Sequence, residues 1–349
     1  MIAAIIMAGG KGERFWPLSR ETTPKQCLAI ISGKTMLEDT ISRLKPLFPI
    51  KNIFIATNSQ LAQYMKKFVP HANYIIEPIG RDTAACIGLS AIQIMRKDPN
   101  AIMFIETTDH VYGNPKEYLE HIKVAIELAK ENNIVLIGIN PTYPSTGFGY
   151  IRHGNLLKNR KIKAYKISEF KEKPDLETAK EFLESANYLW NSGVFVSKCS
   201  VMLDAIKQHM PQLYSCLSRI QKSIFNDKVI KEEFAKLDKV SIDYGVMEKA
   251  HNTVVIRANM HWDDVGDWKA MERINKKDKN GNVVKGKFLG IDTNDCIIYG
   301  DNLVAAYGLK DLIIVNSKDA VLVVPKGKAQ KVKDLVKAMG MEKKFGRYL

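Results

Sequence analysis

Residues 1–26 read MIAAIIMAGGKGERFWPLSRETTPKQ, an apolar run followed by a glycine-containing basic segment. Its first apolar run, Ile2–Met7, has no basic segment before it and no cleavage-site pattern after it, which favours a buried strand over a signal peptide. Glycines stand directly behind the run, at positions 9, 10 and 12. Glycine lets the backbone approach a ligand closely and turn its N–H groups toward anionic oxygens. The stretch therefore predicts a first strand followed by an anion-binding loop.

Short apolar runs and helical patterns alternate through the first half of the chain. The expected strands are Ile2–Met7, Asn52–Thr57, Asn73–Ile76, Ala101–Glu106 and Ile134–Ile139. The expected helices are Thr35–Leu44, Gln60–Phe68, Thr83–Arg96 and Pro115–Lys130. Runs such as AIMFIE are apolar on both faces, which is typical of a parallel sheet covered by helices on both sides. The alternation predicts an α/β, Rossmann-like doubly wound sheet, in which ligands bind at the carboxyl ends of the strands.

The second half mixes strand and helix patterns without clean alternation up to about residue 275. Residues 276–286, KKDKNGNVVKG, are polar and contain glycine, so we expect a linker here. Short β-like runs are then expected at Lys287–Ile291, Cys296–Tyr299, Val304–Ala306, Leu312–Val315 and Ala320–Val324. A last helix carries one apolar stripe, formed by Val332, Leu335, Val336 and Met339. We therefore expect a catalytic domain over residues 1–280 and a small β-helix-like domain over residues 281–349 that ends in this helix.

The composition is that of an ordinary globular protein with an excess of positive charge. The 349 residues are 46% hydrophobic and 26% charged, and the formal net charge is +14. No run approaches the ~20 apolar residues of a membrane span, and no nucleic-acid-binding motif accompanies the basic charge. The five cysteines lack zinc-ligand or CxxC spacing, so we expect free thiols in the cytoplasm. Neither a membrane nor a nucleic acid is therefore expected as a partner.

The loop after the first strand adds cations to its glycines. Lys11, Arg14 and Lys25 lie within it, but no GK[ST] follows at Walker A spacing. Phe15 occupies the place of the third glycine in the dinucleotide fingerprint, which disfavours a dehydrogenase. A glycine-rich turn alone is weak evidence for a ligand, whereas its continuation through WPLSR and PKQ makes the pattern specific.

Seven further segments follow this loop in a fixed order. They are EPIGRDTA (77–84), TTDH (107–110), NPTYPSTGFGYI (140–151), FKEKPD (170–175), WNSGVF (190–195), SIDYGVMEK (241–249) and WDDVGDW (262–268). Together with the loop they resemble the nucleoside-diphosphate-sugar pyrophosphorylase family, most closely its guanylyltransferase branch. The resemblance is dense over residues 1–275 and looser beyond. It implies the nucleotide-diphospho-sugar transferase fold with a mixed sheet, GTP and mannose 1-phosphate as substrates, Mg²⁺ as cofactor, and a homodimer.

By this resemblance, two distant carboxylates hold the magnesium ion. Asp109 follows the apolar run AIMFIE, and Asp264 lies in WDDVGDW beside a glycine. A lone Asp after a strand is more often a helix cap or a turn former. Magnesium, however, takes one or two carboxylates and fills its other positions with phosphate oxygens and water. The family pattern aligns with Asp264 rather than Asp263, and Arg14 and Lys25 complete the implied catalytic set.

The resemblance also assigns a nucleotide site. Its residues are Ala8, Gly9, Gly10, Lys11, Gly12, Glu13, Glu77, Pro78, Asp82 and Thr83. Glu77 is expected to accept hydrogen bonds from guanine N1–H and N2–H₂, which adenine lacks, and a buried unpaired acceptor costs roughly 1–3 kcal/mol. Taken alone, EPIGRDTA is equally a turn with a capping Asp or Thr. Asp82 replaces the family's usual Asn, so the base preference stays open. Glu13 replaces the usual Thr and puts a negative charge near the triphosphate, where it either points outward or binds ribose.

A sugar-phosphate site is implied in the same way. Its residues are Gly147, Gly149, Glu172, Lys173 and Asn191. The two glycines would let backbone N–H groups reach a hexose hydroxyl, Glu172 and Asn191 would contact other hydroxyls, and Lys173 would hold the phosphate. Taken separately, KEKP is more often a solvated charge run and WNSG a surface turn. Their joint occurrence favours the sugar site.

Two other functions compete with GDP-mannose formation. The nearest keeps the chemistry and changes the product to GDP-heptose or to a dTDP-, UDP- or CDP-sugar. The second is a non-catalytic subunit that binds a nucleotide-sugar. Against it stands the intact set of Arg14, Lys25, Asp109, Lys173 and Asp264.

Overall fold

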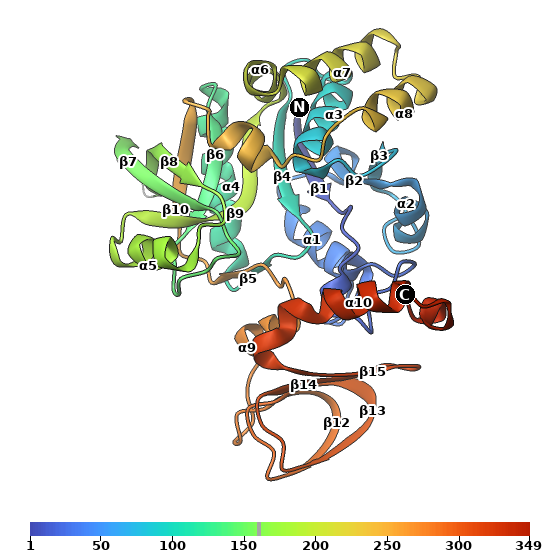
Figure 1. Ribbon diagram of the computed structural model, residues 1–349. Coiled ribbons are helices and arrows are strands. Elements are labelled where there is room, and N and C mark those ends of the chain that lie inside the picture. Colours follow the sequence, from blue (N-terminus) through green and yellow to red (C-terminus); the bar gives the residue numbers. More distant parts are fainter. Residues whose placement is uncertain (159–161) are drawn as a thin grey trace. The chain divides into compact units, whose positions relative to one another are not determined.

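The structure is a computed structural model that describes residues 1–158 and 162–349. It divides into two compact units, whose segments can be followed by colour in Figure 1. Unit 1 comprises Met1–Gly9, Ile41–Thr108 and Tyr112–Trp262. Unit 2 comprises Gly10–Thr40, Asp109–Val111 and Asp263–Leu349. The glycine loop from Gly10 onward and both expected metal ligands therefore belong to unit 2, while the division into sequence domains at residue 280 stays a prediction.

Unit 1 is built on a nine-stranded sheet in the order β3-β2-β1-β4-β9-β6-β10-β8-β7. The strands are β1 Ile2–Met7, β2 Ile53–Asn58, β3 Asn73–Glu77, β4 Ile102–Thr107, β6 Ile134–Ile139, β7 Tyr150–Lys158, β8 Ala164–Lys171, β9 Tyr188–Lys198 and β10 Thr253–Ala258. β1 pairs in parallel with β2 and β4, and β2 pairs in parallel with β3. β9 enters antiparallel between β4 and β6. The expected Rossmann-like mixed sheet is confirmed.

Helices connect these strands. They are α1 Met36–Leu44, α2 Ser59–Met65, α3 Asp82–Met95, α4 Pro115–Lys130, α5 Leu176–Glu184, α6 Cys199–His209, α7 Pro211–Lys222 and α8 Asp227–Ala235, and a π-helical turn covers Asp243–Met247. The side chains of Asn58, Asn114 and Asp175 cap the starts of α2, α4 and α5 by accepting backbone N–H groups. Within residues 1–158 and 162–349, no helix has the length and apolarity needed to cross a bilayer.

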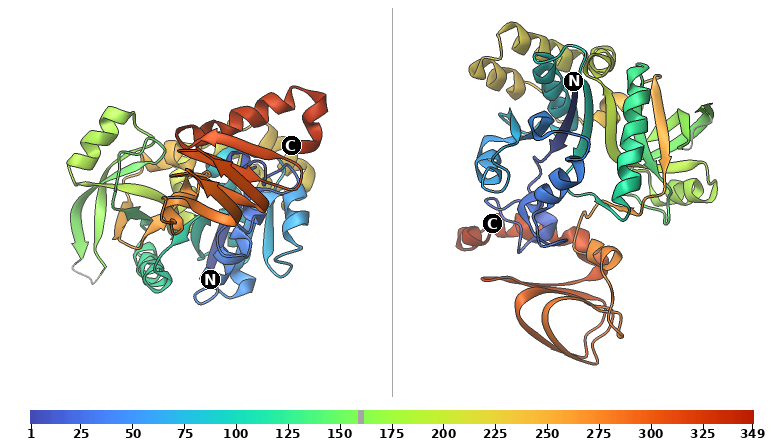
Figure 2. Two further views of the ribbon diagram at one scale, coloured as in Figure 1. Left: turned by 90° about the horizontal axis from the view of Figure 1, so that it is seen from below. Right: turned by 180° about the vertical axis from the view of Figure 1, so that it is seen from behind.

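Both faces of the central strands β1, β2, β4 and β6 are buried, which explains why these strands are largely apolar. Ala3 and Ile5 of β1 belong to the hydrophobic cluster formed with α3, α6 and α7, which Figure 1 shows grouped together. Ala4 and Ile6 point to the opposite face, because side chains alternate along a strand, and they are fully buried as well. α4 packs beside β6, β9 and β10, as the right-hand view of Figure 2 shows. This doubly covered sheet agrees with the expectation for an α/β fold.

Unit 2 contains the expected β-helix-like coil. Its strands are β12 Val283–Ile291, β13 Ile297–Tyr307, β14 Leu312–Asn316 and β15 Val321–Pro325. β12, β13 and β14 pair in parallel, and β15 returns antiparallel to β14. The coil lies between two helices in sequence, α9 Ala270–Ile274 and α10 Val332–Gly340. Two short strands, β5 Val111–Tyr112 and β11 Trp262–Asp263, pair with each other.

Two expectations about the tail were wrong. The linker expected over residues 276–286 ends earlier, because β12 begins at Val283, a buried residue that pairs in register with Ile297. The separate strands expected at 296–299 and 304–306 form one strand, β13. Gly300 lets this strand bend: its φ is +156°, and an added Cβ would lie 2.5 Å from the Asn316 carbonyl oxygen. The polar residues therefore mark a turn that leads into a strand, and the glycine marks a bend inside a strand rather than its end.

Candidate active site

The glycine loop after β1 is fixed by its own side chains. Gly12 adopts a φ of +72°, and a Cβ at this position would lie 2.4 Å from the Cβ of Lys25. Ser19 Oγ donates to the Gly12 carbonyl at 2.7 Å, and Gln26 Nε2 donates to the Gly10 carbonyl at 2.9 Å. Only glycine fits at position 12 without strain, because left-handed backbone and close approach coincide there.

Unit 2 brings together the four residues predicted to be catalytic. Lys25 Nζ forms an ion pair with Asp109 Oδ2. Burial, followed by the nearby Asp109 charge, raises the pKa of Asp264 to about 7. A Cβ on Gly266 would lie 2.8 Å from Asp264 Oδ2 and 3.8 Å from Arg14 Nη1, so these two groups flank the same glycine. Four side chains that are far apart in sequence thus converge on one cluster.

The adjacent Asp263 has a structural role. Its carboxylate forms an ion pair with Arg273, whose Nη2 lies 2.9 Å from Oδ1. The same oxygen accepts the Val265 N–H at 2.9 Å. Asp263 therefore closes the turn that presents Asp264, and this geometry supports the choice of Asp264 as the candidate metal ligand.

The acidic cluster fits a divalent cation. Asp264 is half-buried near Asp109 and Asp263, whose negative charges add to the rise in its pKa, and a cation would relieve this repulsion. In the described part of the chain, no three His, Cys, Asp or Glu side chains gather in a metal-holding group. Mg²⁺ does not require such a group, because one or two carboxylates suffice when phosphate oxygens and water complete its shell.

A shared hydrophobic core supports both the glycine loop and the Asp264 turn. Phe15, which follows Arg14, packs edge-on against Trp268 with ring centroids 5.2 Å apart. Trp268 Nε1 donates to the Trp16 carbonyl at 3.0 Å. These rings lie in one buried cluster with side chains of β12, β13, β14 and β15. Sequence reasoning missed this anchoring, although Trp16 and Trp268 both stand inside the quoted motifs.

Lys11 and Glu13 have contacts that the sequence did not indicate. Lys11 Nζ pairs with Glu21 Oε1 at 3.1 Å on the surface. Lys11 and Glu13 line a pocket of about 180 Å³ together with Arg20 and residues of α10. Glu13, the unusual negative charge of the loop, therefore borders α10, and its part in nucleotide binding stays a prediction.

At the end of β3 in unit 1, Glu77 is a buried carboxylate. Burial raises the pKa of Glu77 to about 7, and the Cys86 thiol of α3 forms a hydrogen bond with it. Among the described residues, Glu77 Oε1 has no hydrogen-bond partner. A Cβ on Gly9 would lie 3.7 Å from Oε2, so the carboxylate borders the start of the glycine loop. Buried acceptors are rarely left without a hydrogen bond in folded proteins. The Oε1 atom of Glu77 is therefore suited to accept a hydrogen bond from a nucleotide base.

Other nucleotide candidates of unit 1 carry structural contacts. Asp82 has a φ of +68°, and its side chain accepts the Thr83 N–H at 2.7 Å. Asp and Asn both tolerate left-handed backbone, which explains the replacement of the family's Asn at this position. Thr83 Oγ1 accepts the Ile242 N–H at 2.8 Å, and the Ala8 carbonyl accepts the Thr57 hydroxyl at 2.9 Å. The binding roles of these residues and of Pro78 stay predictions.

Four of the five predicted sugar-phosphate residues lie together in unit 1. Lys173 Nζ forms an ion pair with Glu172 Oε1 at 2.6 Å. The Asn191 N–H donates to the Gly149 carbonyl at 2.7 Å. A Cβ on Gly149 would lie 2.5 Å from Glu172 Oε2 and 3.3 Å from Asn191 Cβ. Glycine at position 149 therefore makes room for the Glu172 carboxylate.

Gly147 is engaged locally. Its N–H donates to Ser145 Oγ at 3.2 Å, and the Ser145 carbonyl accepts the Tyr150 hydroxyl at 3.0 Å. The next residue, Phe148, packs edge-on against Trp190 with ring centroids 5.1 Å apart. The expectation that the Gly147 N–H reaches a hexose hydroxyl gains no support, because this donor already has an acceptor.

Asp243 completes the sugar-phosphate cluster, although no role was predicted for it. Asn191 Nδ2 donates to Asp243 Oδ1 at 2.9 Å. Burial, followed by the charge of Glu172, raises the pKa of Asp243 to about 7. Glu248, just after the same π-helical turn, accepts the Glu172 N–H at 3.1 Å. The signal was present in SIDYGVMEK, a family-like segment, and such single π-turns are frequent at functional sites.

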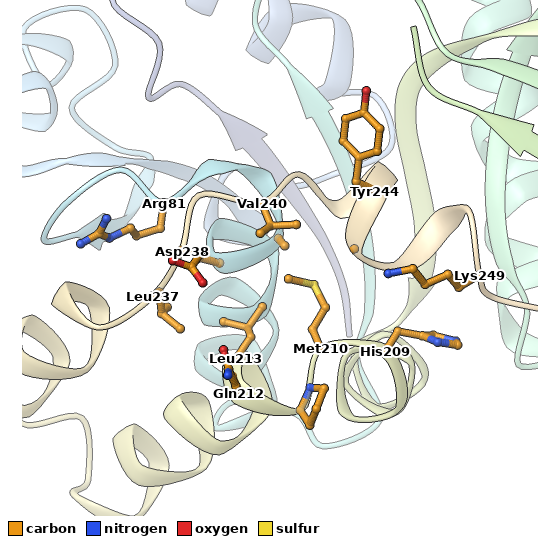
Figure 3. Close-up of a pocket in the computed structure, with 14 residues that line it drawn as sticks. Arg81, His209, Met210, Gln212, Leu213, Leu237, Asp238, Val240, Tyr244 and Lys249 are labelled. Carbon is orange, nitrogen blue, oxygen red and sulfur yellow. The ribbon is translucent and has the colours of Figure 1, made fainter. Parts of the chain in front are cut away.

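A pocket of about 460 Å³ elsewhere in unit 1 is separate from these residues (Figure 3). It is lined by residues of α3, α6, α7 and the segment from 237 to 249, among them Arg81, Met210, Leu213, Asp238 and Tyr244. None of the residues predicted for nucleotide or sugar binding lines it. The candidate site is therefore defined by the charged clusters described above.

Comparisons with known proteins identify the family of this chain. The family model described as Nucleotidyl transferase matches residues 3–281, and a MannoseP isomerase/GMP-like beta-helix domain matches residues 286–339. Mannose-1-phosphate guanylyltransferase of Salmonella montevideo is 38% identical over 98% of this chain and 74% of the relative. Mannose-1-phosphate guanylyltransferase 2 of Escherichia coli O157:H7 is 37% identical over the same shares. A solved structure from Thermus thermophilus, described as a mannose-1-phosphate geranyltransferase, is 35% identical with a TM-score of 0.89, over 97% of this chain and 99% of that one. The resemblance read from the motifs is confirmed, and the chain belongs to the nucleotidyl transferase family.

Proposed function

We propose that this protein transfers GMP from GTP to α-D-mannose 1-phosphate, forming GDP-mannose and releasing pyrophosphate. The observation that carries the proposal is the convergence of Arg14, Lys25, Asp109 and Asp264 beside the glycine loop. The relatives named as mannose-1-phosphate guanylyltransferases, at 37% and 38% identity, support the same pair of substrates.

The reaction needs positioning and charge neutralisation rather than a protein nucleophile. The attacking oxygen of a sugar 1-phosphate is already anionic, so it attacks the α-phosphorus in line while pyrophosphate leaves. Arg14 and the N–H groups of the glycine loop hold the triphosphate and stabilise the charge that develops on the leaving pyrophosphate. Lys25 neutralises the α-phosphate oxygens.

Asp109 and Asp264 would hold Mg²⁺, which when bound supplies further charge neutralisation to the phosphate oxygens. The protein's own groups keep these carboxylates in place. Lys25 pairs with Asp109, and the ion pair between Asp263 and Arg273 closes the turn that carries Asp264. Replacement of Asp109 or Asp264 by a neutral residue would therefore remove a negative charge from a position that the fold holds in place for the cation.

Recognition of the two substrates is divided among other residues. Glu77 accepts hydrogen bonds from the guanine N1–H and N2–H₂ groups, for which its Oε1 has no competing partner in the described structure. Lys173 holds the phosphate of the sugar substrate, while Glu172 and Asn191 contact its hydroxyls. Glu172 and Lys173 form an ion pair with each other. The sugar phosphate therefore meets the positive charge of Lys173, and the sugar hydroxyls meet the neighbouring negative charge of Glu172.

Product analysis tests the proposal directly. The purified protein is incubated with Mg²⁺, mannose 1-phosphate and, in separate reactions, GTP, ATP, UTP, CTP or dTTP. We expect pyrophosphate release and GDP-mannose, identified by mass spectrometry, to be greatest with GTP and to require the sugar phosphate. Asp264→Asn serves as the inactive control. Pyrophosphate release that does not exceed this control with any nucleotide would refute the proposal.

A further inference from the structure

We infer that Asp243 determines which hexose 1-phosphate the protein accepts, by accepting a hydrogen bond from a sugar hydroxyl next to the one that Glu172 contacts. The inference rests on the proposed function, because it names a specificity residue within the same sugar site. It also assigns a role to a residue that the sequence motifs left without one.

Asp243 is held in one orientation by the residues around it. Asn191 Oδ1 accepts the Gly193 N–H at 3.1 Å, which turns the Asn191 NH₂ group toward Asp243. The Asn191 main chain is fixed as well, by its hydrogen bond to the Gly149 carbonyl at 2.7 Å. Asp243 itself is half-buried in the π-helical turn. One oxygen of its carboxylate is therefore held in place, while the residue keeps part of its surface exposed.

The charges of the cluster indicate which end of the substrate lies here. The negative charge of Glu172 disfavours ionisation of Asp243, and Lys173 is the cation that interacts electrostatically with both carboxylates. Two carboxylates repel a phosphate but accept hydrogen bonds from hydroxyl groups. A sugar phosphate is therefore oriented with its phosphate at Lys173 and its ring hydroxyls at Glu172 and Asp243.

This arrangement discriminates between hexoses. Deoxygenation of a recognised position, or its epimerisation, leaves a half-buried acceptor without its donor, and sites built around such hydrogen bonds reject the wrong substrate strongly. Asp243 cannot follow a displaced hydroxyl, because Asn191 fixes one of its oxygens. A purely structural Asp243 would instead support Asn191 and influence every sugar phosphate alike.

The test measures kcat/KM with GTP for mannose 1-phosphate and its four monodeoxy analogues, at C2, C3, C4 and C6. Asp243→Ala should lower kcat/KM for mannose 1-phosphate about 10- to 100-fold, the effect of losing a hydrogen bond to a charged group. For one analogue, which lacks the hydroxyl that Asp243 contacts, the variant should show no further loss. Asp243→Asn, which keeps the shape and an acceptor for Asn191, should lose less and change the ranking of the analogues.

Asp238→Asn is the matched control, because Asp238 is an exposed acid on the same segment and lines the separate pocket of Figure 3. It should leave kcat/KM unchanged for every sugar phosphate. An equal loss for all five sugars in the Asp243 variants would assign Asp243 a structural role and overturn the inference. An unchanged kcat/KM in both variants would overturn it as well.

A binding measurement separates this inference from the proposed function. Calorimetric titration of mannose 1-phosphate into the wild-type protein and the Asp243 variants requires no turnover. If the wild type forms no product, the proposed function fails, while weaker binding to Asp243→Ala than to Asp238→Asn would still support the sugar-recognition role. Equal binding by all variants would overturn that role whatever the turnover.

Discussion

Replacement of Glu77 by Gln should stabilise the protein at alkaline pH and weaken its recognition of guanine. Burial raises the pKa of Glu77 from 4.5 to about 7, and the residue is only 7% exposed. A carboxyl group with a raised folded-state pKa favours folding most below its unfolded pKa, and this stability is lost as the pH rises through about 7. Because one pKa unit is ~1.36 kcal/mol, ionised Glu77 costs about 3 kcal/mol at most. Glutamine keeps the shape of the side chain without that charge.

Urea unfolding of both proteins at about pH 5 and about pH 8 measures this effect. The free energies of unfolding should be similar at the lower pH and differ by about 1–3 kcal/mol in favour of Glu77→Gln at the higher one. The same variant should lose selectivity for GTP over inosine triphosphate, which lacks the 2-amino group. We expect a preference of about 10-fold in the wild type and little preference in the variant.

Glu184→Gln provides the control, because Glu184 is an exposed carboxylate at the end of α5. This variant should show the same stability as the wild type at both pH values. A Glu77→Gln variant whose stability relative to wild type does not change with pH would refute the reasoning, because the cost would then not come from the charge. Unchanged nucleotide selectivity would refute only the assignment of Glu77 to the base.

Four further substitutions test the site. Asp109→Ala and Asp264→Ala should each abolish pyrophosphate release with an unchanged circular dichroism spectrum; full activity of either would contradict the metal assignment. Gly12→Ala places a Cβ 2.4 Å from that of Lys25 in left-handed backbone, so the free energy of unfolding in urea should fall by about 1–3 kcal/mol, and unchanged stability would count against the described loop. Lys173→Ala should mainly raise the KM for the sugar phosphate in steady-state assays, with exposed Lys180→Ala as control; an unaltered KM would exclude a phosphate contact.

The regular elements of unit 1 were predictable because their signals are local. β1, β6 and α4 begin and end at the predicted residues. At the start of α4, Asn114 is the N-cap and Pro115 the first helical residue, and both are visible as letters in the sequence. β13 was not predictable in the same way. Gly300 interrupts its apolar pattern and ends its pairing with β14, and the strand continues because residues 304–307 pair with β12.

Candidate site residues could be named from the sequence where a single motif contains them. They were harder to name where a side chain joins the site only through contacts between motifs. The sequence indicated Glu172 and Asn191, but the Asp243 carboxylate becomes part of their cluster only through folding, which brings its oxygen to 2.9 Å from the Asn191 amide. Gly147 shows the reverse case. The sequence predicts that the Gly147 N–H is available to a ligand, whereas in the structure Ser145, two residues earlier, accepts it.

The β-helix-like strands of unit 2 support the segments that carry the candidate catalytic residues. Phe15 and Trp268, next to the phosphate loop and the Asp264 turn, share a buried core with β12–β15. Trp16 Nε1 donates to the Tyr348 carbonyl at 2.8 Å, and Arg20 pairs with Asp319, just before β15, at 2.8 Å. Closely packed interiors transmit small displacements, so a change in this core shifts the loop and the turn without touching a substrate. Strands β12–β15 therefore help to hold the phosphate loop and the Asp264 turn in position.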